Sequence, residues 1–233
     1  MIKVGCCGFP VSWQEYIKEF KLVEVQKTFY NPPGDNLLIR WREKAPSDFE
    51  FTVKAWQLIT HPSSSPTYRR LKEALDFNRA GFFNNTSVVK YGYKRTVECA
   101  RILNAGIILF QTPPSFTSSK KNINHLRYFF THIATEKFIY IWEPRGKWDW
   151  SEVEKLAREL RIFIAVDPFK VKPFSQKILY FRLHGIGNYR YRYSHRELEQ
   201  LINTIRGLRY DVCYVLFNNI YMWESALKFK ELL

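Results

Sequence analysis

The sequence predicts an α/β protein that folds as one TIM-type (β/α)8 barrel of parallel strands. About eight short apolar runs alternate with helical or irregular stretches along the 233 residues, as expected for a closed parallel barrel. Several of these runs end in a charged or amide side chain, at the position where a barrel carries its substrate face. The alternative is an open doubly wound sheet, which is disfavoured because no G-x-G-x-x-G motif follows any run. No linker or internal repeat interrupts the chain, so we expect a single domain over residues 1–233.

The clearest strand covers residues 178–185, Ile-Leu-Tyr-Phe-Arg-Leu-His-Gly, which begins as an apolar run and ends in polar groups. Strict alternation places Arg182 and His184 on one face of this strand, with Phe181 and Leu183 on the other. A buried strand with polar residues at its carboxyl end is typical of a barrel that presents a substrate site. The structural alternative is an edge strand that ends in solvent.

The remaining elements follow from periodicity and from Gly, Pro and Asn breakers. In chain order, the other strands are predicted over residues 2–8, 22–25, 49–54, 106–111, 138–142, 162–166 and 212–217. Helices are predicted over residues 36–43, 67–77, 88–103, 123–132, 151–160, 194–206 and 221–233. Ser151 and Glu154 have the spacing of a capping box, which predicts that the helix begins there. The proline-containing crossover between strands six and seven, residues 169–177, is expected to be irregular.

Composition limits the classes of function. The hydrophobic fraction of 46% is ample for a core. No apolar run approaches the roughly 18 residues of a membrane span, and the amino terminus does not resemble a signal peptide. We therefore expect a cytoplasmic protein with no membrane partner. The net charge of +14 favours polyanionic partners, although a solvated basic surface would carry the same charge. Cys6, Cys7, Cys99 and Cys213 lack zinc-like spacing with histidine and are expected to be small buried apolar residues.

Polar side chains at the predicted strand ends are the candidate site. The catalytic candidates are Glu24, Glu143, Asp167 and His184, and the substrate-binding candidates are Gln26, Tyr30, Lys54, His61, Gln111, Arg145, Arg182 and Asn218, with Asn219 beside the last. Unpaired charges at such positions are costly, so they should be paired with one another or with a ligand. For any single member, an ion pair that closes the end of the barrel is the structural alternative.

Three kinds of chemistry are compatible with this set. Two carboxylates, Glu143 and Asp167, on adjacent predicted strands could share the roles of general acid and base. Together with His184 they could instead hold a divalent metal ion. However, Lys54, Arg145 and Arg182 bring cations to the same end, and guanidinium groups favour phosphate or carboxylate ligands. We therefore expect an anionic small molecule as substrate and no cofactor, with hydrolase- or lyase-type chemistry. Nucleophilic catalysis is disfavoured because no Gly-x-Ser-x-Gly motif is present.

The segment after the seventh strand carries an alternative function. Tyr189, Arg190, Tyr191, Arg192 and Arg196 alternate aromatic and basic groups, which together supply stacking platforms and phosphate contacts. This pattern is typical of single-stranded nucleic acid binding. The structural alternative is a loop whose tyrosines pack inward while its arginines stay in water. A non-enzymatic, basic nucleic-acid-binding protein is thus the second hypothesis.

Several short motifs in the same order resemble the YecE-like family, which is domain-of-unknown-function family 72. They are Val4-Gly5-Cys6-Cys7-Gly8-Phe9-Pro10, residues 23–30, residues 49–55 with Thr60-His61, residues 109–116, Glu143-Pro144-Arg145 with Trp148, residues 181–185 and Phe217-Asn218-Asn219. The resemblance covers nearly the full chain and implies a TIM-type barrel, but it implies no reaction. Three positions depart from the family pattern. Gln26 stands where the family usually has asparagine, and Pro144 and Gly146 stand where it usually has an aromatic residue and histidine.

Overall fold

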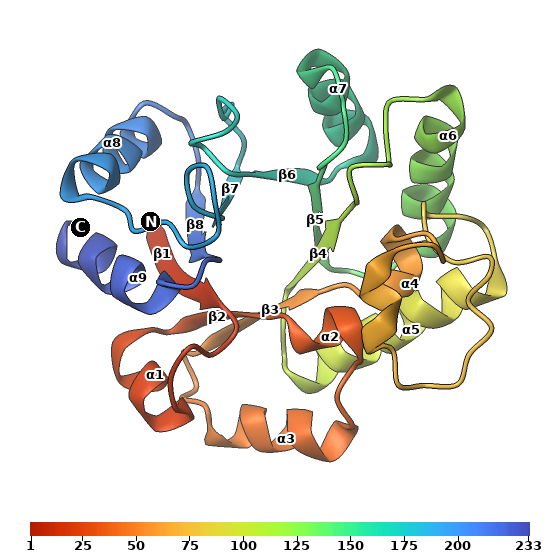
Figure 1. The fold of residues 1–233 in the computed structure, drawn as a ribbon, viewed down its shortest axis with the longest axis horizontal. Coiled ribbons are helices and arrows are strands. Elements are labelled where there is room, and N and C mark those ends of the chain that lie inside the picture. Colours follow the sequence, from red (N-terminus) through yellow and green to blue (C-terminus); the bar gives the residue numbers. More distant parts are fainter. The chain divides into compact units, whose positions relative to one another are not determined.

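Eight parallel strands form a closed barrel in the order β1 to β8 in the computed structural model, which describes residues 1–233 (Figure 1). The strands are β1 (Ile2–Cys7), β2 (Leu22–Val25), β3 (Glu50–Lys54), β4 (Ile107–Gln111), β5 (Ile139–Glu143), β6 (Phe163–Val166), β7 (Ile178–Leu183) and β8 (Val212–Phe217). The predicted fold class and strand positions are confirmed. No helix is long and apolar enough to cross a membrane.

Helices follow most of the strands. They are α1 (Trp13–Glu19), α2 (Lys27–Tyr30), α3 (Asp35–Lys44), α4 (Gln57–Thr60), α5 (Ser87–Ile102), α6 (Lys120–Tyr128), α7 (Trp150–Leu160), α8 (His195–Arg206) and α9 (Met222–Glu231). A 3-10 turn, η1 (Pro66–Arg70), precedes α5, and a π turn, η2 (Phe129–Ile133), extends α6. The short helices α1, α2 and α4 were not predicted. Residues 167–177 join β6 to β7 without a helix.

The helix predicted over residues 67–77 is wrong. Only η1 is helical, and the chain leaves it at Leu71 in an extended conformation. The apolar residues that suggested a helix instead cover a small core built on Trp56 and Tyr68. Phe77 stacks on the Tyr68 ring with centroids 4.5 Å apart, and Leu71 packs against the same cluster. Packing onto this cluster therefore overrides the local helical pattern.

The predicted capping box at Ser151 and Glu154 is also wrong. The residue that caps α7 is Asp149, whose carboxylate accepts a hydrogen bond from the Ser151 backbone N–H at 2.8 Å. A capping box is present at α8, where the Ser194 side chain and Glu197 exchange hydrogen bonds with each other's backbone N–H groups. A carboxylate two residues before the predicted cap is therefore the residue that caps the helix.

By its internal contacts the chain divides into two compact units. The expected single domain over residues 1–233 stays a prediction. The first unit comprises residues 1–24, 45–50 and 165–233. In it β7 pairs with β8 and β8 with β1, and α9 packs on β1, β8 and α8 (Figure 1). The register of β1 and β2 places Cys7 opposite Glu24 at the carboxyl ends of these strands.

The second unit comprises residues 25–44 and 51–164. In it β3, β4 and β5 pair in order, and the register places Gln111 opposite Glu143. Its core is strongly aromatic. The fully buried ring of Phe83 contacts the rings of Phe110, Phe116, Phe129 and Phe130, with centroids 4.9 to 5.9 Å apart. Such packing holds the three strands rigidly, so the groups at their carboxyl ends have fixed positions.

All four cysteines are free and buried, as predicted. Burial raises the pKa of each thiol, and for Cys213 the value reaches about 12. The thiolate, which is the reactive form of cysteine, is therefore suppressed. These residues serve the core as small apolar side chains.

Candidate active site

The most deeply buried charges of the first unit are Glu24 on β2 and Arg182 on β7, both with no exposed surface. The guanidinium group of Arg182 donates two hydrogen bonds to the carboxylate of Glu24, from Nε to Oε2 at 3.0 Å and from Nη2 to Oε1 at 2.8 Å. Tyr180, two residues before Arg182 on the same strand face, donates its hydroxyl to Oε2 at 2.8 Å. Glu24 therefore accepts hydrogen bonds from at least three donor groups, which fix the position of its carboxylate.

A second contact of the first unit joins the ends of β6 and β7. The Asp167 carboxylate accepts the backbone N–H of His184 at 2.9 Å and that of Phe169 at 3.1 Å. Its Oδ2 atom also lies 3.5 Å from Nδ1 of His184 and 3.8 Å from Nζ of Lys170. Because both carboxylate oxygens accept backbone hydrogen bonds, Asp167 fixes the backbone at His184 and lies beside its imidazole ring.

In the second unit, Lys54 at the end of β3 is a buried ammonium group. Its Nζ donates to Oε1 of Gln111 at 2.6 Å and lies 4.0 Å from the centre of the Phe29 ring. Gln111 ends the next strand, β4, so two neighbouring strand ends hold the amino group in place. The Phe29 ring was not predicted as part of the site. A cation over an aromatic face is stabilised by the ring quadrupole.

His61 follows α4 and is also buried. Its Nδ1 lies 2.8 Å from the Thr60 hydroxyl, and its ring packs edge-on against Phe29 with centroids 4.9 Å apart. Burial, together with the charge of Lys54, lowers the pKa of His61 to about 3. The imidazole is consequently neutral at physiological pH and acts as a hydrogen-bonding group rather than a cation.

Glu143 ends β5 and is buried, and Arg145 reaches back to it. The Arg145 Nη1 donates to Glu143 Oε1 at 2.9 Å, while about a third of the Arg145 side chain remains exposed. Gly146 follows in a tightly closed turn. A Cβ atom at this position would lie 2.1 Å from the carbonyl oxygen of Phe116. The family histidine therefore cannot be accommodated here without a shift of the backbone.

The other predicted substrate-binding residues lie at α2 in the second unit and directly after β8 in the first. Gln26 directly precedes α2, and its side chain makes no capping hydrogen bond to the helix. Tyr30 ends the same helix, and its carbonyl accepts a hydrogen bond from Nε2 of Gln57 at 3.1 Å. In the first unit, Asn218 follows β8 and accepts the Tyr189 hydroxyl at 3.3 Å. Asn219 is fully buried and donates Nδ2 to the Tyr191 carbonyl at 2.6 Å. Both asparagines therefore fasten the 189–196 segment to the end of β8.

The aromatic groups of the 189–196 segment differ in exposure. Tyr193 is buried, accepts the Gly185 backbone N–H and packs on Phe169 and Phe217. Tyr191 is half-buried, and its hydroxyl donates to Glu197. Only Tyr189, which is half exposed, presents its ring to solvent.

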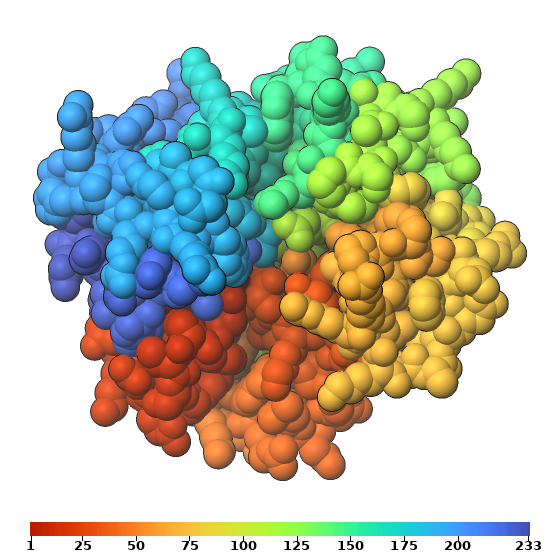
Figure 2. All heavy atoms as spheres, viewed as in Figure 1, coloured from red at the N-terminus to blue at the C-terminus, as the bar shows by residue number.

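The basic groups of this segment also differ. Arg192 pairs with Glu224, and its guanidinium lies 3.5 Å from the centre of the Tyr221 ring. Arg190 and Arg196 are exposed. Figure 2 shows the part of the segment around residue 190, in light blue, at the surface. The structure contains no group of three or more His, Cys, Asp or Glu side chains that could hold a metal ion.

The comparisons with known proteins agree with this fold. The model of the family described as "Protein of unknown function DUF72" matches residues 12–233. The UPF0759 protein YunF of Bacillus subtilis is 24% identical over 94% of this chain and 84% of its own length. A DUF72 family protein from Enterococcus faecalis V583 has a TM-score of 0.76 and 19% identity, covering 100% of this chain and 95% of its own. One from Thermotoga maritima MSB8 has a TM-score of 0.75 and 24% identity, covering 100% of this chain and 98% of its own. The chain thus belongs to the DUF72 family of TIM-type barrels.

Proposed function

We propose that this protein is an enzyme that binds an anionic small molecule at the carboxyl ends of its strands and acts on it by hydrolase- or lyase-type acid–base chemistry. The observation that carries the proposal is the buried ammonium group of Lys54, held by Gln111 beside the neutral imidazole of His61. Glu143, the register partner of Gln111, ends the next strand. A cation, a neutral imidazole and a carboxylate thus lie at the ends of β3, α4 and β5 of one unit.

The placement of Lys54 favours an anionic ligand. Burying an ammonium group is costly unless opposing charges or hydrogen bonds offset the loss of hydration. The amide oxygen of Gln111 and the face of Phe29 stabilise the ammonium charge at this position. A phosphate or carboxylate group of a substrate would add a charge-assisted hydrogen bond at this position.

Glu143 is the group we assign to proton transfer. Its carboxylate is buried and receives a hydrogen bond from Arg145, which orients it. His61 stays neutral, so it can donate or accept a hydrogen bond to an uncharged part of the substrate. In the first unit, His184 beside Asp167 is a further candidate acid or base. Glu24 and Arg182 would then act as structural support.

The second candidate function is binding of single-stranded nucleic acid by the 189–196 segment. Tyr189, Arg190 and Arg196 are the exposed groups that favour it. Against it, Tyr193 is buried and Arg192 is paired with Glu224, so the alternating pattern does not form a continuous stacking surface. We therefore rank this function below the enzyme.

Isothermal titration calorimetry tests the anion site. The probes are inorganic phosphate, glycerol 3-phosphate and malate, titrated into the wild type, Lys54→Met and Lys90→Met. Lys90 is exposed on α5, so its replacement removes the same charge outside the site. We expect at least one probe to lose tenfold or more in affinity in Lys54→Met alone, because one charge-assisted hydrogen bond is worth about 1.5–3 kcal/mol. Equal loss in both variants would mean diffuse attraction to the basic surface, and the proposal would be wrong.

A further inference from the structure

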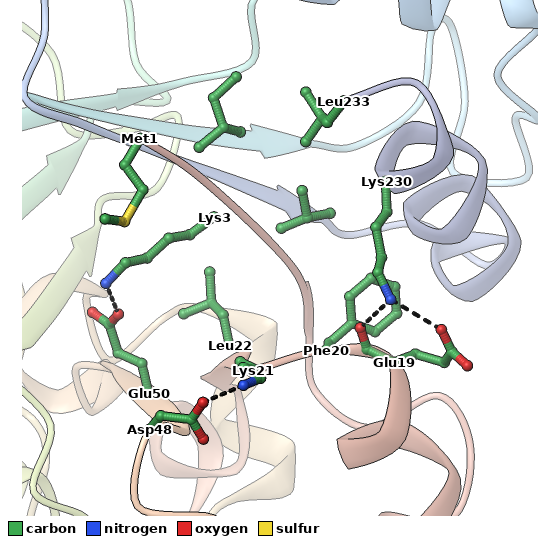
Figure 3. A pocket seen from close by; sticks show the side chains of 12 residues that line it. Met1, Lys3, Glu19, Phe20, Lys21, Leu22, Asp48, Glu50, Lys230 and Leu233 are labelled. Carbon is green, nitrogen blue, oxygen red and sulfur yellow. Dashed lines mark hydrogen bonds and ion pairs between the residues drawn. The ribbon is translucent and has the colours of Figure 1, made fainter.

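A cavity of about 370 Å³ lies in the first unit at the amino ends of β1 and β2 (Figure 3). It is lined by Ile2, Val4 and Leu22, which begin these strands, and not by Cys7 or Glu24, which lie toward their carboxyl ends. Because a strand advances about 3.3 Å per residue, the six residues of β1 separate its two ends by ~16 Å. The cavity is therefore distinct from the candidate active site.

The floor of the cavity is apolar and rigid. Phe20 and Leu22 are almost completely buried, each 2% exposed. The Phe20 ring contacts Tyr16 and Trp223, with centroids 5.4 Å from each. The apolar surface that a ligand could remove from water therefore belongs to Ile2 and Val4, which line the cavity above this floor and are half-buried.

The rim of the cavity consists of three ion pairs, drawn as dashed lines in Figure 3. They join Lys3 to Glu50, Lys21 to Asp48 and Lys230 to Glu19.

The Lys3–Glu50 pair is the most buried of the three. Glu50 also accepts the Tyr214 hydroxyl at 2.7 Å, and the Lys3 ammonium lies 5.3 Å from the centre of the Tyr214 ring. Each lysine on the rim is paired with a carboxylate. The three pairs therefore supply hydrogen-bond donors and acceptors, and their side-chain charges cancel.

We propose that this cavity is a second ligand site, which binds a small amphipathic molecule without net charge. Its apolar body would lie on Ile2 and Val4, and its polar end would bond to the Lys3–Glu50 pair. An anion would gain little at this rim, because each ammonium group already has a carboxylate partner. The volume is within the lower part of the roughly 300–1,000 Å³ range of small-molecule pockets. A ligand here would bind at the amino ends of β1 and β2, away from Cys7 and Glu24 at their carboxyl ends.

The test uses N-phenyl-1-naphthylamine, an uncharged dye whose emission rises in apolar sites, and its sulfonated analogue 1-anilinonaphthalene-8-sulfonate. Ile2→Trp places a large ring in the cavity, and Ile39→Trp adds the same ring to the exposed side of α3 as the matched control. We expect Ile2→Trp to weaken binding of the uncharged dye at least tenfold and Ile39→Trp to leave it unchanged. The loss should be smaller for the sulfonate, which binds elsewhere on the basic surface.

Equal binding of the uncharged dye by the two variants would overturn the proposal. If Ile2→Trp does not fold, as judged by its thermal unfolding, Lys230→Trp blocks the same opening from the exposed end of α9. Unchanged dye binding in Lys230→Trp would then overturn it. A second copy of the chain is the other possible occupant, and sedimentation velocity tests for it. A self-association that Ile2→Trp abolishes would show that a second copy fills the cavity, and the proposal would be wrong.

Discussion

Arg182 and Glu24 form a two-point ion pair with no solvent exposure, at 2.8 and 3.0 Å, between β7 and β2 of the first unit. A guanidinium group matches a carboxylate in this geometry, which a lysine cannot reproduce. The pair also receives the hydroxyl of Tyr180 on Glu24. Removal of either partner would leave the charge of the other buried without its opposite charge.

Arg182→Met should therefore lower the free energy of unfolding by about 3–5 kcal/mol, because it leaves a buried carboxylate without its cation. Urea unfolding at pH 7 measures the change. The exposed pair of Arg158 and Glu154 on α7 is the control, and Arg158→Met should cost at most about 1 kcal/mol. The double variant Arg182→Met with Glu24→Leu should recover part of the loss. A double variant as unstable as the sum of the single changes would contradict this account of the pair.

The pKa of His61 predicts a pH dependence of stability. In the folded protein it is lowered to about 3, mainly by burial, whereas an unfolded chain titrates near 6.5. Between these values the unfolded state binds more protons than the folded state. The contribution of the neutral His61 to the free energy of unfolding is therefore fully present above about pH 6.5 and is lost as the pH falls toward 3. The free energy of unfolding should fall by about 1.4 kcal/mol per pH unit well inside this window. His61→Gln should remove this part of the slope, whereas replacement of the exposed His132 should not. Parallel curves for His61→Gln and the wild type would show that His61 titrates normally.

Gly146 provides a steric prediction. A Cβ atom would meet the Phe116 carbonyl oxygen at 2.1 Å, whereas a Cβ atom at Gly106 would meet nothing within 4 Å. Gly146→Ala should destabilise the protein by about 1–3 kcal/mol, the usual cost of overpacking. Gly106→Ala should be neutral or stabilising by up to about 1 kcal/mol, because it reduces the freedom of the unfolded chain. Thermal unfolding of both variants checks the difference, and equal midpoints would mean that the turn at Gly146 relaxes easily.

The nucleic-acid alternative predicts a salt effect. For single strands, the slope of log affinity against log salt is about −0.7 per neutralised phosphate. Replacement of the exposed Arg190 and Arg196 by glutamine should therefore flatten the slope by about 1.4, measured with a fluorescent oligonucleotide. Arg192→Gln should change it less, because Arg192 is paired with Glu224. Tyr189→Leu should lower affinity with little change of slope, since stacking releases few ions. An unaltered slope in the double arginine variant would show diffuse attraction and would eliminate this alternative.

The sequence was most informative where burial and alternation act together. The β7 pattern placed Arg182 and His184 on one face; in the structure Arg182 contacts Glu24, and His184 lies beside Asp167. Alternation specifies the face of a strand, but it does not reveal which charge of another strand will be the partner. The Arg182–Glu24 pair and the contact of Lys54 with Gln111 each join residues far apart in the chain, so no local pattern identifies the partners.

The errors of the sequence analysis have local causes. Residues 67–77 contain apolar groups at helical spacing, yet Phe77 stacks on Tyr68 and the chain stays irregular. Cap chemistry was ambiguous because Asp149 and Ser151 can both accept a backbone hydrogen bond, and the structure uses the aspartate. Phe29 was not expected in the site because an aromatic residue beside a strand end has no distinctive sequence pattern.

Turnover of an anionic compound is the most direct test of the proposed enzyme. The purified wild type, Glu143→Gln and Glu154→Gln are incubated with a small-molecule cell extract, with and without added Mg²⁺ or Mn²⁺, and consumption is followed by mass spectrometry. Glu154→Gln removes one partly exposed carboxylate from α7 and is the matched control. We predict that at least one phosphorylated or carboxylated compound disappears with the wild type and Glu154→Gln, and is consumed at least 100-fold more slowly with Glu143→Gln, the usual effect of losing a general acid or base. Consumption of no compound by the wild type, or equal consumption by Glu143→Gln, would contradict the account.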